Sequence, residues 1–128
     1  MELMPVNPMR HAELTEQIIG CAYTVSNDLG VGFLESVYEK ALVHELRKAG
    51  LKAEQQVPLH VKYDGVVVGE FYPDVIVNSE VIVELKAVRA FEDIYMAQCL
   101  NYLRATNLKV ALLINFGTPK IQIKRVVL

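Results

Sequence analysis

The segment at residues 72–88, YPDVIVNSEVIVELKAV, is the most apolar hairpin that the sequence predicts. Valine and isoleucine fill most of its positions, and the turn-forming residues at 78–80 separate two strand-like runs. Asp74, Glu84 and Lys86 interrupt this pattern with three ionisable side chains. A buried charge costs free energy unless it is partnered, so these three residues need an explanation.

The length of the loop decides whether the two carboxylates can meet. Side chains alternate along a strand, so Glu84 and Lys86 share one face of the sheet. With a two-residue loop, Asp74 pairs with Val83 and the carboxylates fall on opposite faces. With a three-residue loop at 78–80, Asp74 pairs with Glu84, and we expect this register.

The charges themselves allow two interpretations. Paired carboxylates about 4 Å apart repel each other by roughly 4 kcal/mol at an effective dielectric constant near 20. Lys86 offsets part of this repulsion, and a hard divalent cation would offset more, because Mg²⁺ and Mn²⁺ prefer oxygen ligands. Taken alone, however, the pattern Asp-x9-Glu-x-Lys is more often a set of charges on the solvated face of a sheet.

The rest of the chain predicts a single α/β domain over residues 1–128, with a mixed central sheet flanked by helices. The Asp64-Gly65 pair predicts a type I′ turn, and the strand–helix–strand passage at 80–116 implies a right-handed crossover. The predicted elements are a helix that begins near Asn7-Pro8 and ends at Gly30, a helix at about 34–49, strands at 56–63, 66–72, 74–77 and 81–88, a helix at about 92–105, and strands at 109–115 and 121–128.

Composition excludes several classes of protein. No apolar run is long enough to span a membrane, and the N-terminus lacks the apolar core of a signal peptide, so we expect a soluble, cytoplasmic protein. Cys21 and Cys99 are too few for a disulfide framework and are expected to be reduced. The net charge of −2 gives no general attraction to nucleic acid, so such a partner needs a local basic patch or a bound cation.

The helix predicted at 92–105 carries two opposite apolar stripes, and one of them must pack on the sheet. Gln98 and Tyr102 lie one turn apart and form polar tips within the first stripe. If the second stripe is not covered by the first helix of the chain, we expect it to form a homodimer. This second stripe contains Met96, Cys99, Leu100 and Leu103.

The helix predicted at 34–49 places a carboxylate among apolar side chains. Glu35 and Tyr38 lie three residues apart near its start, and Glu35 falls within the apolar arc, where it requires a partner. Glu45 falls in the same arc, so periodicity alone does not select Glu35. Glu39 lies at the margin of the arc and is expected to be solvated.

Together these segments resemble the GxxExxY family, whose members look like compact versions of the PD-(D/E)xK nuclease superfamily. The resemblance runs from about Leu14 to the end of the chain, and its order of motifs implies a restriction-endonuclease-like αβββαβ core. The motifs stand here as GFLESVY at 32–38, Pro73-Asp74, Glu84-Leu85-Lys86, and QCLNY at 98–102, which matches the QxxxY motif of the RecB-like branch.

The resemblance implies metal-dependent hydrolysis of phosphodiester bonds in nucleic acid, with DNA the expected substrate and Mg²⁺ or Mn²⁺ the cofactor. Asp74 and Glu84 would bind the ion directly, and the backbone carbonyl of Leu85 would be a further ligand. Glu35 would complete the site, directly or through water. Lys86 would orient and help to deprotonate the attacking water, or stabilise charge on the phosphate.

The resemblance gives Gln98 and Tyr102 the role of positioning the phosphate backbone or the side chains of the site. Nucleic-acid contacts are expected from one of two basic clusters, although either can equally be a solvated surface. Because fold and function separate readily, the alternative is a non-catalytic nucleic-acid-binding or assembly module on the same fold. The two clusters are Lys120, Lys124 and Arg125, and Arg47, Lys48 and Lys52.

Overall fold

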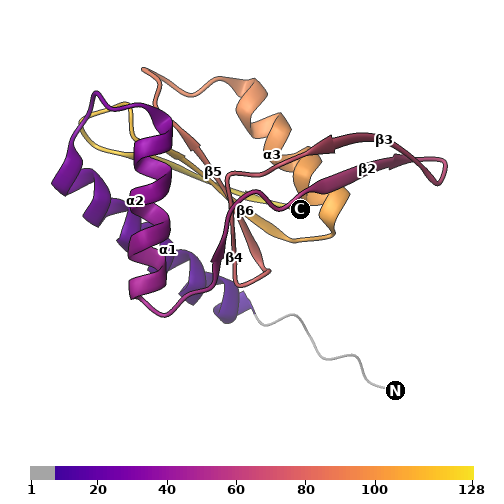
Figure 1. Cartoon of the computed structure of the whole chain (residues 1–128), viewed down its shortest axis with the longest axis horizontal. Coiled ribbons are helices and arrows are strands. Elements are labelled where there is room, and N and C mark those ends of the chain that lie inside the picture. The colour runs from indigo at the N-terminus through magenta and orange to yellow at the C-terminus, as the bar shows by residue number, and fades with distance from the viewer. Residues whose placement is uncertain (1–7) are drawn as a thin grey trace.

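The computed structural model describes residues 8–128, and the predicted helix cap at Asn7 lies outside them (Figure 1). The helix predictions agree with the structure to within about one residue at each described end. In chain order the elements are α1 Pro8–Leu29, α2 Glu35–Lys48, β1 Ala53–Glu54, β2 Leu59–Tyr63, β3 Val66–Phe71, β4 Val75–Val77, β5 Val81–Lys86, α3 Asp93–Thr106, β6 Val110–Asn115 and β7 Gln122–Val127.

A five-stranded sheet forms the centre of the molecule, with the order β1-β4-β5-β6-β7. β5 and β6 run parallel, and the other neighbouring pairs are antiparallel. This arrangement confirms the predicted mixed sheet with a helical crossover. β6 lies between two neighbours and is buried at every position, which is the reason for its almost wholly apolar sequence.

Helices cover both faces of this sheet (Figure 1). α1 and α2 pack against one face, where Leu42 and Leu112 belong to a shared apolar cluster. α3 packs against the other face and buries Cys99 and Leu103 against Ile82 and Leu113. The second stripe of α3 is therefore covered by the sheet and not by α1, and it does not offer a free surface for the predicted homodimer.

The hairpin β2–β3 stands apart from the central sheet as a two-stranded ribbon that projects beside α3 (Figure 1). Its turn is as predicted, because Asp64 and Gly65 have φ angles of 53° and 77°, the positive values that a type I′ turn requires. These two strands do not join the central sheet. β1 takes the place beside β4, and Leu59 of the ribbon instead packs with the α3 cluster.

The β4–β5 hairpin has the register expected for a three-residue loop. Val77 pairs with Val81 and Val75 pairs with Val83, which places position 74 opposite position 84. Asn78 tolerates the left-handed conformation at φ 52°, and its side-chain Oδ1 accepts a 2.8 Å hydrogen bond from the backbone N–H of Lys52. The charged positions therefore fall on the face that α3 covers.

Asn115 joins the end of β6 to the chain that leaves β5. It is fully buried, and its Oδ1 accepts hydrogen bonds from the backbone N–H groups of Val88 at 3.0 Å and Gly117 at 2.9 Å. Its Nδ2 donates to the carbonyl of Val88 at 2.9 Å. The two chain segments approach so closely here that a Cβ on Gly117 would lie 2.3 Å from the carbonyl oxygen of Val88.

Gly117→Ala is expected to lower the free energy of unfolding by about 3 kcal/mol, because the new methyl group meets backbone atoms that cannot rotate away. Denaturant unfolding followed by circular dichroism measures the change. Gly20→Ala is the matched control, since a Cβ there has open space and a helical position favours alanine by about 0.5–1 kcal/mol. Equal stabilities for the two variants would contradict the close approach.

Candidate active site

Asp74 and Glu84 meet across the β4–β5 hairpin, as the register predicts. The backbone N–H of Asp74 donates to Oε1 of Glu84 at 2.9 Å, and the backbone N–H of Leu85 donates to Oδ2 of Asp74 at 2.8 Å. Each carboxylate is thus held by the backbone of the opposite segment. Glu84 is only 8% exposed, so it is an ionisable group within the protein interior and not on a solvated face.

Glu35 reaches the same site from the first turn of α2. Burial raises its pKa, while the positive charge of Lys86 partly lowers it. Glu35 in turn helps to raise the pKa of both Asp74 and Glu84. The three predicted acidic residues therefore influence the pKa values of one another, and the charge of Lys86 acts on all three. They are Glu35 on α2, Asp74 before β4 and Glu84 on β5.

Tyr38 holds the corner between α1 and α2 that places Glu35. Its hydroxyl donates to the carbonyl of Gly30 at 2.6 Å and accepts from the backbone N–H of Phe33 at 3.2 Å. Its ring is buried and stacks on Phe116 with centroids 4.9 Å apart. The tyrosine of the 32–38 motif is therefore a structural residue that orients the glutamate three positions before it.

Tyr38→Phe keeps the ring but leaves two backbone groups without their partner. We expect a loss of about 1–3 kcal/mol in the free energy of unfolding, measured by denaturant titration. Tyr63→Phe is the control, since Tyr63 is 76% exposed at the tip of the ribbon and its variant should match the parent. A Tyr38→Phe protein as stable as the parent would mean that the hydroxyl does not hold the corner.

Glu39 belongs to the site although we expected it to be solvated, so that prediction is wrong. Its Oε2 accepts a 2.6 Å hydrogen bond from Nε2 of Gln55, and its carboxyl shares a side-chain hydrogen bond with Asp74. Burial raises the pKa of Glu39, and the charge of Asp74 and this second bond raise it further, whereas the same bond lowers the pKa of Asp74. The four-residue spacing from Glu35 puts both glutamates on one helix face and could have indicated this role.

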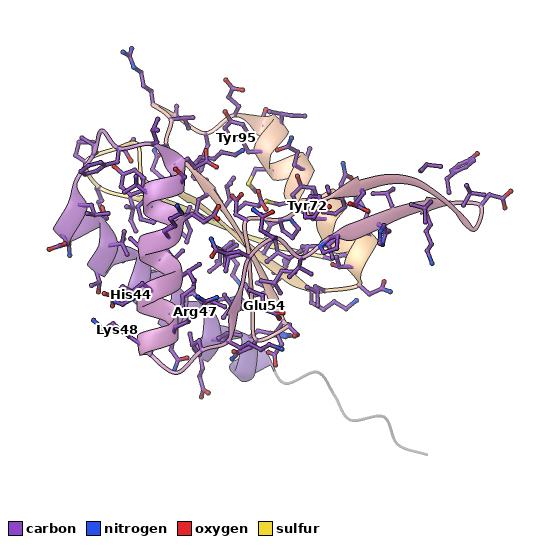
Figure 2. The ribbon with its side chains drawn as sticks, viewed as in Figure 1. His44, Arg47, Lys48, Glu54, Tyr72 and Tyr95 are labelled. Atoms are coloured by element: carbon purple, nitrogen blue, oxygen red, sulfur yellow. The ribbon has the colours of Figure 1, made fainter. Side chains whose placement is uncertain are left out.

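Lys86 is positioned by an aromatic ring that the sequence did not single out for this role. Its Nζ lies 4.6 Å from the centroid of Tyr95, close enough for a cation–π interaction. Tyr95 stands near the start of α3, beyond the end of β5 (Figure 2). The ring thus supports the ammonium group while leaving it within electrostatic reach of Asp74 and Glu84.

The site carries more negative charge than its single lysine can balance. Burial raises the pKa of Glu84 to about 8, with a further contribution from the charge of Asp74. Burial also raises the pKa of Asp74, and to this is added the charge of Glu35. Such a cluster is stabilised either by bound protons or by a cation that replaces them.

The donor atoms suit a hard divalent cation, but they are not already arranged around one. Within residues 8–128, no group of three or more histidine, cysteine, aspartate or glutamate side chains is spaced to hold a metal ion. Asp74 and Glu84 each use one oxygen toward the backbone, and a carboxylate has a second oxygen with which to bind metal. The chemistry of the site therefore fits Mg²⁺ or Mn²⁺, provided that the carboxylates move together when the ion binds.

The two polar residues predicted on α3 differ in their burial. Tyr102 is half-buried, its ring stacks on Phe71 at 4.1 Å, and its pKa is raised by burial and by the charges of Glu84 and Asp74. Gln98 is exposed, whereas its neighbour Cys99 is buried below the site, where burial and Glu84 raise its pKa to about 12. Tyr102 thus lies within the field of the carboxylates, and Gln98, one turn before it, is exposed to solvent.

The basic residues near the end of the chain do not form one surface. Lys124 pairs with Leu113, which pairs with Glu84, so Lys124 lies on the α3 face two strands away from the site. The next residue, Arg125, points to the opposite face by strand alternation. Lys120 is exposed in the turn before β7.

The alternative basic cluster is occupied by local contacts. Arg47 donates to the carbonyl of Ala53 at 2.9 Å, and Lys52 lies 3.5 Å from the carboxylate of Glu54. Lys48 pairs with a glutamate on its own helix at 3.3 Å. Arg47, Lys48 and Glu54 lie around the C-terminal end of α2, whereas Glu35 lies at its other end (Figure 2).

Comparisons with known proteins concern the family and the fold of the chain. A family model described as the PD-(D/E)XK nuclease superfamily matches residues 12–126. The crystal structure of SSO0001 is similar, with a TM-score of 0.57, 20% sequence identity, and coverage of 91% of this chain and 58% of that chain. At this identity the likeness concerns the fold alone. A comparison with curated proteins found no match.

The sheet and its helices are consistent with a restriction-endonuclease-like fold, as expected from the order of the motifs. This chain spans less than two thirds of the length of SSO0001. None of the helices within residues 8–128 is both long and apolar enough to cross a membrane.

Proposed function

This chain belongs to the PD-(D/E)XK nuclease superfamily, and from that premise we propose that it is a metal-dependent nuclease that hydrolyses phosphodiester bonds, with DNA as its substrate. The observation that carries the proposal is the buried group of carboxylates that meets Lys86 at the end of the β4–β5 hairpin. Asp74 and Glu84 hold each other there through backbone hydrogen bonds, and Glu35 joins them from α2.

The residues that would hold Mg²⁺ or Mn²⁺ are Asp74 and Glu84, with the carbonyl of Leu85 and with Glu35 directly or through water. Such an ion, when bound, lowers the pKa of water and neutralises charge on a phosphate. The raised pKa values of Asp74 and Glu84, caused by burial and by neighbouring carboxylates, support this assignment, because a divalent cation binds ionised carboxylates in place of protons.

The other polar residues prepare the site for a phosphodiester. Lys86, supported by the ring of Tyr95, would orient and help to deprotonate the attacking water or stabilise charge on the phosphate. Glu39 would hold Asp74 in place through their hydrogen bond. Tyr102 and Gln98, one turn apart on α3, would position the phosphate backbone.

Among the predicted basic contacts, Lys124 is the best placed, because its row of the sheet also contains Glu84. Contacts from Lys120 and Arg125 remain proposals that need a substrate extending around the β7 edge. A cytoplasmic location agrees with the free thiols of Cys21 and Cys99 and also remains a proposal.

A cleavage panel tests the proposed function. The full chain is incubated with Mn²⁺ or Mg²⁺ and with single-stranded, duplex and branched DNA and single-stranded RNA, and the products are resolved on denaturing gels. We expect metal-dependent products that disappear with EDTA. Absence of cleavage across the panel, together with absence of Mn²⁺ binding by calorimetry, would overturn the proposal.

A non-catalytic nucleic-acid-binding module is the second candidate. It is favoured by the observation that the acidic residues of the described chain are not already spaced around a metal position. This candidate predicts no turnover by the parent and equal nucleic-acid affinity after Glu84→Ala or Lys86→Ala. A parent protein that cleaves, with variants that do not, excludes it.

A further inference from the structure

A cavity of about 680 Å³ lies between the β2–β3 ribbon and α3. His60, Lys62 and Phe71 line it from the ribbon, and Tyr102 and Arg104 line it from the helix. The ribbon lies beside α3 and extends beyond it (Figure 1). Of the residues that line this groove, the function proposed above uses only Tyr102, and the carboxylates do not line it.

The groove and the acidic site are neighbours, because Phe71 in the groove wall is three residues before Asp74. Tyr102 belongs to the groove wall, and the charges of Glu84 and Asp74 raise its pKa, so the hydroxyl lies within their field. On the opposite wall, Phe71 is separated from Asp74 by two residues of an extended connection. A polymer bound at the carboxylates would therefore lie within about 10 Å of Phe71 in the groove wall.

The walls of the groove carry positive charge on both sides. Lys62 and Arg104 are exposed, and within residues 8–128 neither forms an ion pair with a carboxylate within 4.0 Å. His60 is different, because its Nε2 lies 3.0 Å from Oε2 of Glu70, which occupies it locally. Two cations thus line the groove, Lys62 from the ribbon and Arg104 from the helix, where Arg104 also donates to Oδ1 of Asn101 at 3.3 Å, in a protein whose net charge is −2.

Two aromatic side chains also line the groove. Phe71 and Tyr102 stack with an interplanar angle of 15°, and both are only half-buried. A groove that combines cationic rims with aromatic side chains is the arrangement that binds single strands, because phosphates meet the cations and unpaired bases meet the rings. Duplex DNA keeps its bases stacked inside and is read by convex elements that enter its own grooves, which a concave channel cannot do.

We propose that the groove between the β2–β3 ribbon and α3 binds a single strand of nucleic acid and leads it to the acidic site. This inference rests on the proposed nuclease function for the purpose of the strand, but binding in the groove is independent of cleavage. The substrate class is therefore an unpaired segment, whether in a free strand or in a flap.

The test measures binding without turnover. Fluorescence anisotropy with a labelled oligothymidylate in EDTA compares the parent with the double variant Lys62→Glu/Arg104→Glu. We expect the variant to bind about tenfold more weakly or worse and to show a smaller dependence of affinity on salt concentration. Lys48→Glu is the control, since that exposed lysine lies at the far end of α2, and its variant should bind as the parent does.

Three outcomes overturn the proposal: undiminished binding by the double variant, an equal loss with Lys48→Glu, or parent affinity for a duplex of the same length that matches or exceeds that for the single strand. The milder pair Lys62→Gln/Arg104→Gln serves if charge reversal prevents folding, as judged by thermal unfolding. Failure of the two proposals is distinguishable. If the parent cleaves and the groove variants bind as the parent does, only the groove proposal fails. If binding depends on the groove residues but the parent does not cleave, only the nuclease proposal fails.

Discussion

Lys86→Ala is expected to reduce the rate of nucleic-acid cleavage by about 10²–10⁴-fold, the range typical for loss of a group that assists proton transfer. The reason is its position: Nζ lies over the ring of Tyr95 and within the field of Asp74 and Glu84, where a water or a phosphate would bind. Single-turnover cleavage in Mn²⁺ measures the effect on the chemical step without the contribution of product release.

Two further variants make this prediction specific. Lys48→Ala removes an exposed lysine roughly 20 Å along α2 from Glu35 and should cleave at the parent rate. Lys86→Arg keeps the positive charge but cannot give up a proton, so partial activity identifies charge stabilisation and full inactivity identifies proton transfer. If Lys86→Ala and Lys48→Ala cleave equally fast, the assignment of Lys86 fails, and the activity comes from elsewhere or from a contaminant.

The stability of the metal-free protein is expected to fall as the pH rises from about 5 to about 8. The pKa of Glu84 is about 8 in the folded protein because of burial and the nearby charge of Asp74, whereas the pKa in the unfolded chain is near the ordinary 4.5. Between these values the folded protein binds more protons than the unfolded chain, so its stabilisation is complete below pH 4.5 and is lost as the pH passes 8. At about 1.4 kcal/mol for each pKa unit, the loss has an upper limit of about 5 kcal/mol.

Denaturant unfolding in EDTA at a series of pH values measures this slope. Glu84→Gln is the matched control, because the amide keeps an oxygen to accept from the N–H of Asp74 but does not ionise. The slope should be smaller in the variant, with the remainder caused by the raised pKa of Asp74. A slope that is equal in parent and variant would show that Glu84 titrates at its ordinary pKa.

Mn²⁺ should restore the stability that the parent loses at pH 8. A cation that binds only the folded protein stabilises it by mass action and competes with protons for the same carboxylates. The restoration should be absent from Glu84→Gln, which lacks one negative charge in the proposed ligand set. An equal effect of Mn²⁺ on both proteins would place the ion elsewhere.

The sequence alone determined the hairpin that carries Asp74 and Glu84. The valine and isoleucine runs on either side of positions 78–80 predict two paired strands, but both faces of these strands are buried, so the apolar pattern allowed a two-residue or a three-residue loop and the structure has the three-residue one. That information is local, because it depends on side chains that follow one another along the chain. The helix limits and the type I′ turn at Asp64-Gly65 were predictable for the same reason.

Only the tertiary structure decided which other residues complete the site. Glu39, Gln55 and Tyr95 join it because α2 and α3 dock on opposite faces of one sheet and bring their first turns to the end of β5. The β2–β3 ribbon is not part of the central sheet, because β1 pairs with β4 at that edge. The sequence pattern of the ribbon itself does not indicate this pairing. Contacts of this kind depend on how whole elements pack, and the periodicity of a single element specifies its buried face but not its neighbour.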